Sequence, residues 1–154
     1  MKLNLGCGPD IKEGYINVDI RPLPGVDLVA DICSLSLEPE SVDKIVAYDV
    51  LEHISFLLTS MVLHSWIELL KPGGTIVVRV PDLAKILDRF VNSKLPTFEA
   101  QRLVYGGQDY EHNVHRAGFT QGMLEGLLLG CGCSEVIQVI REEDSHNITL
   151  VARR

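Results

Sequence analysis

The fold of this chain is decided by its N-terminal stretch, Lys2-Leu3-Asn4-Leu5-Gly6-Cys7-Gly8-Pro9. Residues 2–5 have the character of a short strand, and the glycines that follow let the backbone turn and approach a ligand closely. A glycine loop of this kind typically lies at the carboxyl edge of a parallel sheet. The stretch therefore predicts a first strand that leads directly into a ligand-binding loop.

Short apolar runs alternate with helical patterns along the rest of the chain. The runs are nearly continuous in Val, Ile and Leu, which indicates strands buried on both faces of a parallel sheet. Strands are predicted at residues 2–5, 15–20, 26–31, 42–48, 75–80, 135–141 and 147–153, helices at 55–70, 83–91 and 121–129, and a polar hairpin turn at 142–146. We therefore predict an α/β fold, a doubly wound, mostly parallel seven-stranded sheet with a C-terminal antiparallel hairpin, in one domain over residues 1–154.

Two connections differ from the usual pattern of such a sheet. Pro9 and Gly14 bracket only residues 10–13, whereas a parallel crossover normally takes about a dozen residues or more. The first crossover helix is therefore predicted to be truncated, which disfavours a phosphate-bearing ligand that needs a helix N-terminus there. Residues 94–118 show the least regular pattern, and loops of that length usually form lids or binding loops.

Bulk composition excludes several classes of partner. The 154 residues are 46% hydrophobic and 23% charged, as expected for one globular domain. The formal net charge of −7 opposes binding to a polyanion, so nucleic acid is disfavoured. The four cysteines lack zinc-site spacing and are expected to be reduced thiols in the cytoplasm. The sequence also shows no signal-peptide pattern and no apolar stretch of membrane-spanning length, so we expect no membrane partner.

Aspartates lie at the ends of three successive predicted strands: Asp19, Asp31 and, just past the fourth strand, Asp49. Because the carboxyl ends of parallel strands meet at one edge, these residues are expected to form an acidic rim that suits a cationic ligand. Asp19 comes thirteen positions after Gly6 and can accept hydrogen bonds from both hydroxyls of a ribose. That spacing is shorter than the roughly 20 residues typical of NAD sites, and Ile11 stands where a third glycine is expected.

The motifs, taken in order, resemble the class I S-adenosylmethionine-dependent methyltransferases of the type 11 group. They are Leu-Gly-Cys-Gly, Asn-Val-Asp, Ala-Asp-Ile, Val-Leu-Glu-His and Leu-Lys-Pro-Gly-Gly, and they cover about residues 2–83. The resemblance implies methyltransferase activity with S-adenosylmethionine, which carries a ribose but no phosphate. It also implies a set of cofactor-binding residues, namely Leu5, Gly6, Cys7, Gly8, Asp19, Ile20, Asp31, Ile32, Asp49 and Val50.

The same resemblance assigns parts of the cofactor to these residues. The glycine loop would line the methionine and ribose, Asp19 would hold the ribose hydroxyls, and Ile20 would pack on the adenine. The pair after the third strand would read the adenine amino edge, and the pair after the fourth would lie near the methionyl end. In relatives a helical extension before the first strand often helps to cover the site, and the sequence shows none before residue 2. Together with the truncated first crossover, this departure leads us to expect an open cleft that a homodimer or a partner protein would cover.

Histidines are the candidate acid–base groups. The loop at residues 105–116 combines aromatic, acidic and imidazole side chains, and its end resembles a segment of some type 11 relatives. Either the loop is a structured surface segment whose histidine anchors a turn, or it is an acceptor-binding lid in which His115 or His112 takes a proton. Histidine suits that role because its unperturbed pKa lies near neutrality. We take His115 and His53 as the catalytic candidates.

A possible metal motif follows the fourth strand. Asp49-x-x-Glu52-His53 resembles, with Asp for Glu, the Glu-x-x-Glu-His cluster that binds a divalent metal in small-RNA 2′-O-methyltransferases. The Glu-His pair also occurs widely in relatives expected to be metal-free, and the net charge disfavours an RNA substrate. The sequence therefore predicts no metal ligand here.

The function expected from these features is methyl transfer to a small-molecule or saccharide-like acceptor. The cofactor supplies the activated methyl group, so the protein must mainly hold the acceptor in line with the S–CH3 bond. Two alternatives stay open. The open cleft favours a non-catalytic S-adenosylmethionine-binding module or a partner-dependent subunit. A nucleotide-sugar or dinucleotide enzyme can also use this fold, since fold does not determine function.

Overall fold

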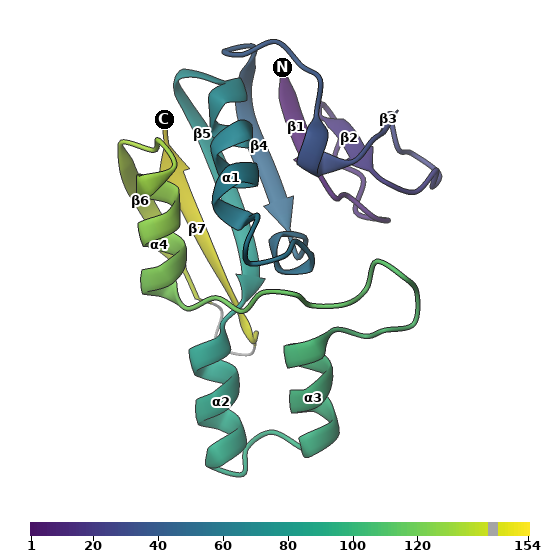
Figure 1. Cartoon of the computed structure of the whole chain (residues 1–154), viewed down its shortest axis with the longest axis vertical. Helices are drawn as coiled ribbons and strands as arrows, with labels where there is room; N and C mark the ends of the chain where they lie inside the picture. The colour runs from purple at the N-terminus through teal and green to yellow at the C-terminus, as the bar shows by residue number, and fades with distance from the viewer. Residues whose placement is uncertain (142–144) are drawn as a thin grey trace.

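A seven-stranded sheet forms the centre of the computed structural model, which describes residues 1–141 and 145–154 (Figure 1). The strands are β1 (Lys2–Leu5), β2 (Ile16–Asp19), β3 (Leu28–Val29), β4 (Val42–Tyr48), β5 (Leu70–Pro81), β6 (Glu135–Ile140) and β7 (Asn147–Arg153). Their order across the sheet is β3-β2-β1-β4-β5-β7-β6. The first five pair in parallel, and β7 pairs antiparallel with both β5 and β6. This confirms the predicted α/β fold class and its C-terminal antiparallel pair.

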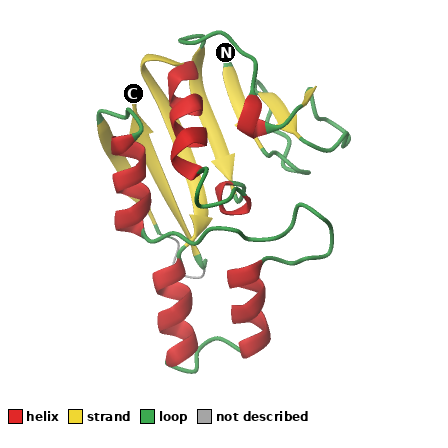
Figure 2. Ribbon diagram, in the orientation of Figure 1, coloured by secondary structure: helices red, strands yellow, loops and turns green. Residues whose placement is uncertain are grey.

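The helices of the described residues gather in two places. They are α1 (Thr59–Leu69), α2 (Leu83–Val91), α3 (Thr97–Tyr105) and α4 (Gln121–Gly130), with short 3-10 turns η1 (Ile32–Ser34) and η2 (Leu51–His53). Helices α1 and α4 lie over one face of the sheet, whereas α2 and α3 lie side by side beyond the strand ends (Figure 2). Within the described part of the chain, no helix combines the length and the apolar character needed to cross a bilayer.

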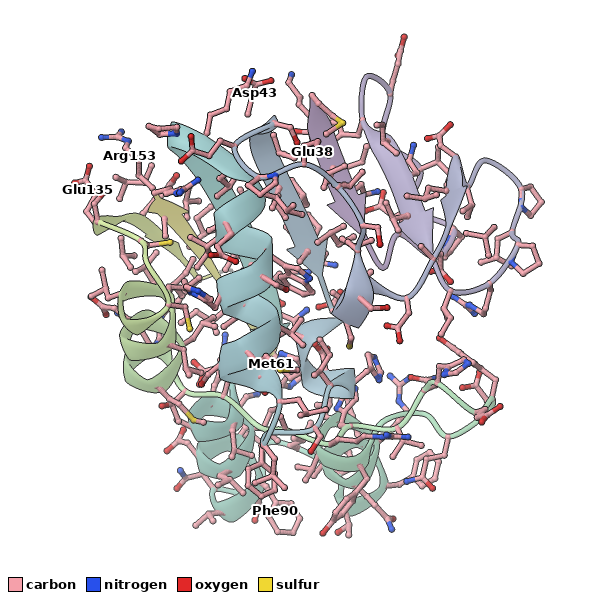
Figure 3. The ribbon with its side chains drawn as sticks, turned by 45° about the horizontal axis from the view of Figure 1, so that its top comes forward. Glu38, Asp43, Met61, Phe90, Glu135 and Arg153 are labelled. Atoms are coloured by element: carbon pink, nitrogen blue, oxygen red, sulfur yellow. The ribbon has the colours of Figure 1, made fainter. Side chains whose placement is uncertain are left out.

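The core lies between the sheet and helices α1 and α4. Successive side chains of a strand point to opposite faces, so Ile45 of β4 and Ile76 of β5 join the core cluster from one face. Trp66 enters the same cluster from α1 and is fully buried. At the edge of the sheet, Arg153 of β7 pairs with Glu135 of β6 at 2.5 Å (Figure 3). The apolar residues whose spacing predicted the strands and helices therefore form the faces that meet in this core.

The first crossover is truncated, as predicted. Residues 6–15 form turns without a helix, and the backbone N–H of Cys7 donates to the carbonyl oxygen of Val18 at 3.0 Å. Asn17 on β2 also fills the space under this loop, because its side chain binds Lys12 and Asp27. The short connection therefore brings the glycine loop directly against the end of β2.

Several predicted boundaries are wrong by a few residues. Helix α1 begins at Thr59 rather than residue 55, because the N–H of Leu58 and the hydroxyl of Thr59 both donate to the carbonyl of Ser55 in a separate turn. Strand β3 is shorter than predicted because Asp31 already caps η1 through the N–H of Cys33. Of the predicted hairpin turn at 142–146, residues 142–144 lie outside the described residues.

The irregular stretch 94–118 contains a helix that the sequence analysis missed. Helix α3 begins after Pro96 and packs against α2, where Ala100 joins Ile86 and Leu95 in a small second core. Five of its nine residues are apolar, but their pattern has meaning only once α2 lies beside them. The remaining residues, 106–118, form the extended loop that was expected in this region.

Replacing Trp66 by phenylalanine is expected to lower the free energy of unfolding by about 2–3 kcal/mol. The indole Nε1–H donates to the carbonyl oxygen of Ile32 at 2.8 Å, so the substitution leaves a buried carbonyl unpaired and a small cavity. Urea unfolding followed by circular dichroism checks this. Circular dichroism takes the place of tryptophan fluorescence, because Trp66 is the only tryptophan and the variant lacks it. Met61→Ala is the control on the same helix, because Met61 is exposed (Figure 3). An equal loss in both variants would contradict the prediction.

Candidate functional site

A cavity of about 220 Å³ lies at the carboxyl ends of β1, β4 and β5. The sequence predicted that Gly6, Cys7, Gly8 and Asp49 gather here, and all four border it. The lining residues are Asn4, Gly6, Cys7, Gly8, Pro9, Asp10, Arg21, Tyr48, Asp49, Arg79 and Tyr110. Three strand ends and the long loop after α3 therefore contribute to one site.

The carboxylate of Asp19 holds the glycine loop through the backbone of Gly8. Asp19 is only 4% exposed, and this carboxylate accepts hydrogen bonds from the N–H of Gly8 at 2.8 Å and from the N–H and Nε of Arg21 at 2.9 and 3.1 Å. Burial alone would raise the pKa of Asp19, but the hydrogen bonds from Arg21 and Gly8 outweigh it and hold this pKa below its usual value. Three of the roughly four acceptor positions of the carboxylate are thus occupied.

Asp49 is also paired with an arginine. Arg79 of β5 donates through Nε to both carboxylate oxygens of Asp49 at 3.1 Å and through a second nitrogen, and Asn147 donates to Oδ1 at 3.0 Å. Since Asp19 is paired with Arg21 in the same way, the acidic rim expected at this edge is neutralised at these two residues. Arg79 reaches this edge of the sheet from β5, and Arg21 reaches it from the loop after β2. The strand pattern alone does not predict that either arginine lies there.

The residues predicted to hold the adenine lie on the same edge but outside the cavity. Ile20 and Asp31 are exposed, whereas Ile32 is buried and its carbonyl accepts the hydrogen bond from Trp66. The N–H of Ala30 donates to the carbonyl of Asp19 at 3.0 Å, which aligns the ends of β2 and β3. The structure therefore brings the predicted segments together at one edge, as the sequence analysis required.

Two predicted cofactor residues support the loop from the side away from the cavity. Leu5 is fully buried in the core. A Cβ atom built on Gly6 would lie 2.2 Å from Cγ2 of Val50, so Val50 packs directly against the glycine loop. Neither side chain lines the cavity, and we interpret both as residues that shape the loop.

Four large side chains of this site were missed by the sequence analysis. Arg21 stacks on Tyr110 with its guanidinium 4.5 Å from the ring centre, and Arg79 stacks on Tyr48 at 4.4 Å. One signal was available for Arg79, since it is the charged residue inside the apolar run 75–80. Tyr110 lies in the loop that was expected to act as a lid. Its position at the cavity depends on contacts across the fold.

The second half of the site is formed by a long-range contact between residues 52–53 and 114–117. The carbonyl of Glu52 accepts from the N–H groups of Arg116 and Ala117 at 2.7 and 3.1 Å, and Nδ1 of His53 bonds the carbonyl of Val114 at 3.1 Å. These bonds bring the two predicted catalytic histidines together, with ring centres 4.9 Å apart. His112, the other candidate in the loop, is exposed.

The two imidazoles are partly buried beside the buried carboxyl group of Glu52. Burial lowers the pKa of both His53 and His115, partly opposed in each case by the hydrogen bond to a backbone carbonyl. Burial raises the pKa of Glu52 to about 8, and nearby Asp49 adds to this rise. At neutral pH both imidazoles are therefore neutral, and Glu52 is ready to hold or release a proton.

A second cavity of about 220 Å³ lies between α2, α3 and the last residues of the long loop. Its wall consists mostly of apolar side chains, with His115 and Arg116 at one side. The lining residues are Pro81, Leu83, Ile86, Leu103, Val104, Tyr105, His115, Arg116, Ala117 and Gly118. Pro81 is two residues beyond Arg79 in β5, so residues at the end of this one strand border both cavities.

Comparison with known families agrees with this geometry. A family profile described as "Methyltransferase domain" matches residues 3–78, which is about half of the chain. The matched part contains the glycine loop, Asp19, Asp49 and the Glu52–His53 pair. Among curated proteins, none matches this sequence.

Solved structures share the whole fold. An S-adenosylmethionine-dependent methyltransferase from Mesorhizobium loti superposes with a TM-score of 0.68 at 14% identity, covering 99% of this chain and 90% of that one. The Burkholderia thailandensis 1,6-didemethyltoxoflavin-N1-methyltransferase, solved with bound 1,6-didemethyltoxoflavin and S-adenosylhomocysteine, gives 0.66 at 15% identity, covering 99% and 70%. A putative methyltransferase from Haloferax volcanii, solved with the Trm112 activator, gives 0.64 at 13% identity, covering 99% and 80%.

Proposed function

This chain is a class I, type 11-like methyltransferase that uses S-adenosylmethionine, and we propose that it methylates a small, largely apolar acceptor held between α2 and α3. The observation that carries the proposal is the arrangement of the two cavities around the end of β5. One is polar and bordered by the glycine loop, and the other is apolar and bordered by His115. A cofactor in the first can present its methyl group toward an acceptor in the second.

The first cavity fits the polar part of the cofactor. A Cβ atom on Gly6 would occupy space already filled by Val50, and Gly8 borders the cavity while its N–H donates to Asp19. Oδ2 of Asp19 accepts one hydrogen bond, so it keeps an acceptor position for a ribose hydroxyl. Holding both hydroxyls requires Arg21 to leave Oδ1 of Asp19. We propose that Arg21 and Arg79 then face the carboxylate of the methionyl tail.

The adenine is proposed to lie against the residues that follow β2 and β3. Ile20 exposes an apolar side chain there, and Asp31 exposes a carboxylate that can accept from an adenine amino group. Ile32 is buried with its backbone held by Trp66. These features support the adenine roles that the family resemblance implied.

The second cavity supports a small acceptor with an aromatic or aliphatic body rather than a saccharide. The side chains of Leu83, Ile86 and Leu103 cannot form hydrogen bonds with an acceptor. A saccharide would need several hydrogen bonds to the wall of the cavity. The bound cofactor supplies an activated methyl group, and the acceptor atom must approach it in line. For an acceptor that loses a proton, His115 and His53 are our candidate acid–base groups.

Two measurements test the proposed function. Calorimetry is expected to show binding of S-adenosylhomocysteine and no binding of NAD. Radiolabelled S-adenosylmethionine is then offered with phenols, aromatic amines and saccharides, and label is expected in the aromatic acceptors. Failure to bind S-adenosylhomocysteine would end the proposal. Label found only in saccharides would overturn the assignment of the apolar cavity.

Filling the second cavity should separate acceptor binding from cofactor binding. Val104→Phe is expected to lower methyl transfer at least about tenfold, because the larger side chain takes the acceptor's place. The dissociation constant of S-adenosylhomocysteine should stay unchanged. Gln101→Phe on the exposed side of α3 is the matched control. Transfer at the wild-type rate by Val104→Phe, or equal losses in both variants, would show that the acceptor binds elsewhere.

A partner-dependent subunit is the second candidate function. It is favoured by the exposure of Ile20 at the adenine side and by the activator found with the Haloferax volcanii neighbour. Methyl transfer by the purified chain alone would eliminate it. The net charge of −7 continues to disfavour nucleic acid as acceptor. We also propose a cytoplasmic location, since all four cysteines are free thiols.

A further inference from the structure

We propose that Glu52, His53 and His115 bind one divalent transition-metal ion, at the wall of the apolar cavity. One carboxylate oxygen of Glu52 and one ring nitrogen from each histidine lie within 4.8 Å of one another. Two imidazoles and one carboxylate are a ligand set used by zinc and by non-haem iron. The three residues come from segments about 60 positions apart, so the tertiary fold assembles the set.

The histidines are oriented as metal ligands usually are. Nδ1 of His53 bonds the carbonyl oxygen of Val114 at 3.1 Å, and Nδ1 of His115 bonds the carbonyl oxygen of Leu103 at 2.9 Å. A carbonyl oxygen only accepts hydrogen bonds, so each Nδ1 carries the proton and each neutral ring keeps its lone pair on Nε2. A backbone carbonyl on the far nitrogen is the common way in which a protein aims a metal-binding histidine.

Glu52 provides the second, independent observation. It is only 2% exposed, and its Oε2 has no hydrogen-bond partner among the described residues. A buried polar oxygen without a partner costs about 1–3 kcal/mol, and a buried unpaired charge costs more. A divalent cation bound between Glu52 and the histidines removes this cost. Hydrogen bonding between Glu52 and the imidazoles does not remove it for Oε2, since that atom lacks any such bond.

The distances allow an ion after small side-chain rotations. Ligand atoms that each lie roughly 2.0–2.2 Å from a shared ion are about 3–3.5 Å apart, which is slightly closer than the limit of 4.8 Å found here. Asp49 is not part of the set, because its carboxylate is held by Arg79 and Asn147. Thus His115, rather than Asp49, completes the group that the sequence motif suggested.

The ion's remaining coordination position would face the acceptor. Three protein ligands typically leave a position for water or substrate, and His115 borders the apolar cavity. An oxygen of the acceptor bound there would lose its proton more easily, because a divalent cation lowers the pKa of an oxygen that it binds. This role rests on the proposed function, whereas ion binding itself does not.

Metal binding is tested on the purified chain without cofactor. After treatment with EDTA and removal of the chelator, titration with Zn²⁺ is expected to show one equivalent bound, and Co²⁺ is expected to give a visible ligand-field band. Mg²⁺ should not compete, because it prefers oxygen ligands. Absence of saturable Zn²⁺ binding would overturn the proposal. Failure to bind S-adenosylhomocysteine would sink the proposed function without affecting this result.

Variants locate the ion. Glu52→Gln and His115→Gln are each expected to weaken Zn²⁺ binding at least about 100-fold. Loss of a residue that only supports a ligand costs roughly 10- to 100-fold in metal affinity, and loss of a ligand itself should cost at least the upper end of that range. His112→Gln and His64→Gln are the controls, since these histidines lie outside the cluster. Melting of each metal-free variant checks its fold, and Zn²⁺ should raise the melting temperature of the wild type and the controls only. Unchanged binding in Glu52→Gln or His115→Gln, or a loss in either control, would refute the site.

Discussion

Gly6→Ala is expected to abolish detectable binding of S-adenosylhomocysteine and to lower the free energy of unfolding by about 3 kcal/mol or more. Gly6 has a φ of +60°, where a residue with a Cβ atom is strained. The added Cβ would lie 2.2 Å from Cγ2 and 2.7 Å from Cβ of Val50. Because Val50 lies two residues beyond the end of β4 and packs against the core, neither side can move without displacing the strand ends that border the cavity.

Gly8→Ala is the matched control for this prediction. Gly8 has a similar φ of +51°, but the nearest atom to its added Cβ is the flexible end of Arg21 at 3.5 Å. Its cost is therefore expected to be limited to backbone strain of about 1–2 kcal/mol. Urea unfolding and calorimetry with S-adenosylhomocysteine measure both effects. If Gly6→Ala proves no more destabilising than Gly8→Ala, the close packing of Val50 against the loop is not what shapes the site.

Asp19→Ala is expected to weaken binding of S-adenosylhomocysteine by at least about 100-fold, which corresponds to roughly 2.7 kcal/mol. The substitution removes a buried carboxylate that holds Gly8 and Arg21. It leaves the N–H of Gly8 and the guanidinium of Arg21 without their partner, and removal of one partner from a buried pair is strongly destabilising. It also removes the acceptor that we assign to the ribose.

Asp19→Asn separates the structural part of this effect from the ribose contact. Asparagine keeps the shape and one acceptor oxygen, so the fold should survive while binding still falls about tenfold or more. Asp43→Asn is the surface control, since Asp43 lies at the opposite end of the sheet with Lys71 and the N-terminus (Figure 3). If Asp19→Asn bound S-adenosylhomocysteine with wild-type affinity, Asp19 would not be the residue that binds the ribose. A loss of affinity in Asp43→Asn would show that binding responds to any change in charge.

The pairing of each site aspartate with an arginine changes how cofactor entry is understood. The folded chain already satisfies Asp19 with Arg21 and Asp49 with Arg79. Arg21 also stacks on Tyr110 from the long loop. A ribose that donates both of its hydroxyls to Asp19, as we propose, would displace Arg21 from Oδ1, and the stacked Tyr110 would then change its contact as well. Tyr110 of the long loop is thus connected through Arg21 to the residue that we propose binds the ribose.

The sequence by itself determined the parallel sheet, its antiparallel end and the glycine loop. Strand patterns and glycine positions depend on neighbouring residues along the chain, and the aligned ends of parallel strands follow from topology. Gly6, Gly8, Asp19 and Asp49 could therefore be predicted to meet at one edge. The order of the motifs likewise predicted the cofactor, because each motif follows its own strand.

Only the tertiary structure decided which side chains complete the site. Arg79 and Tyr110 reach the first cavity from β5 and from the long loop, and helix α3 exists because α2 gives its apolar residues a partner. His115 meets Glu52 and His53 through hydrogen bonds between segments more than 60 residues apart. Such contacts depend on the closure of the chain around the core. No local pattern encodes them, because their energy comes from groups that are neighbours only after folding.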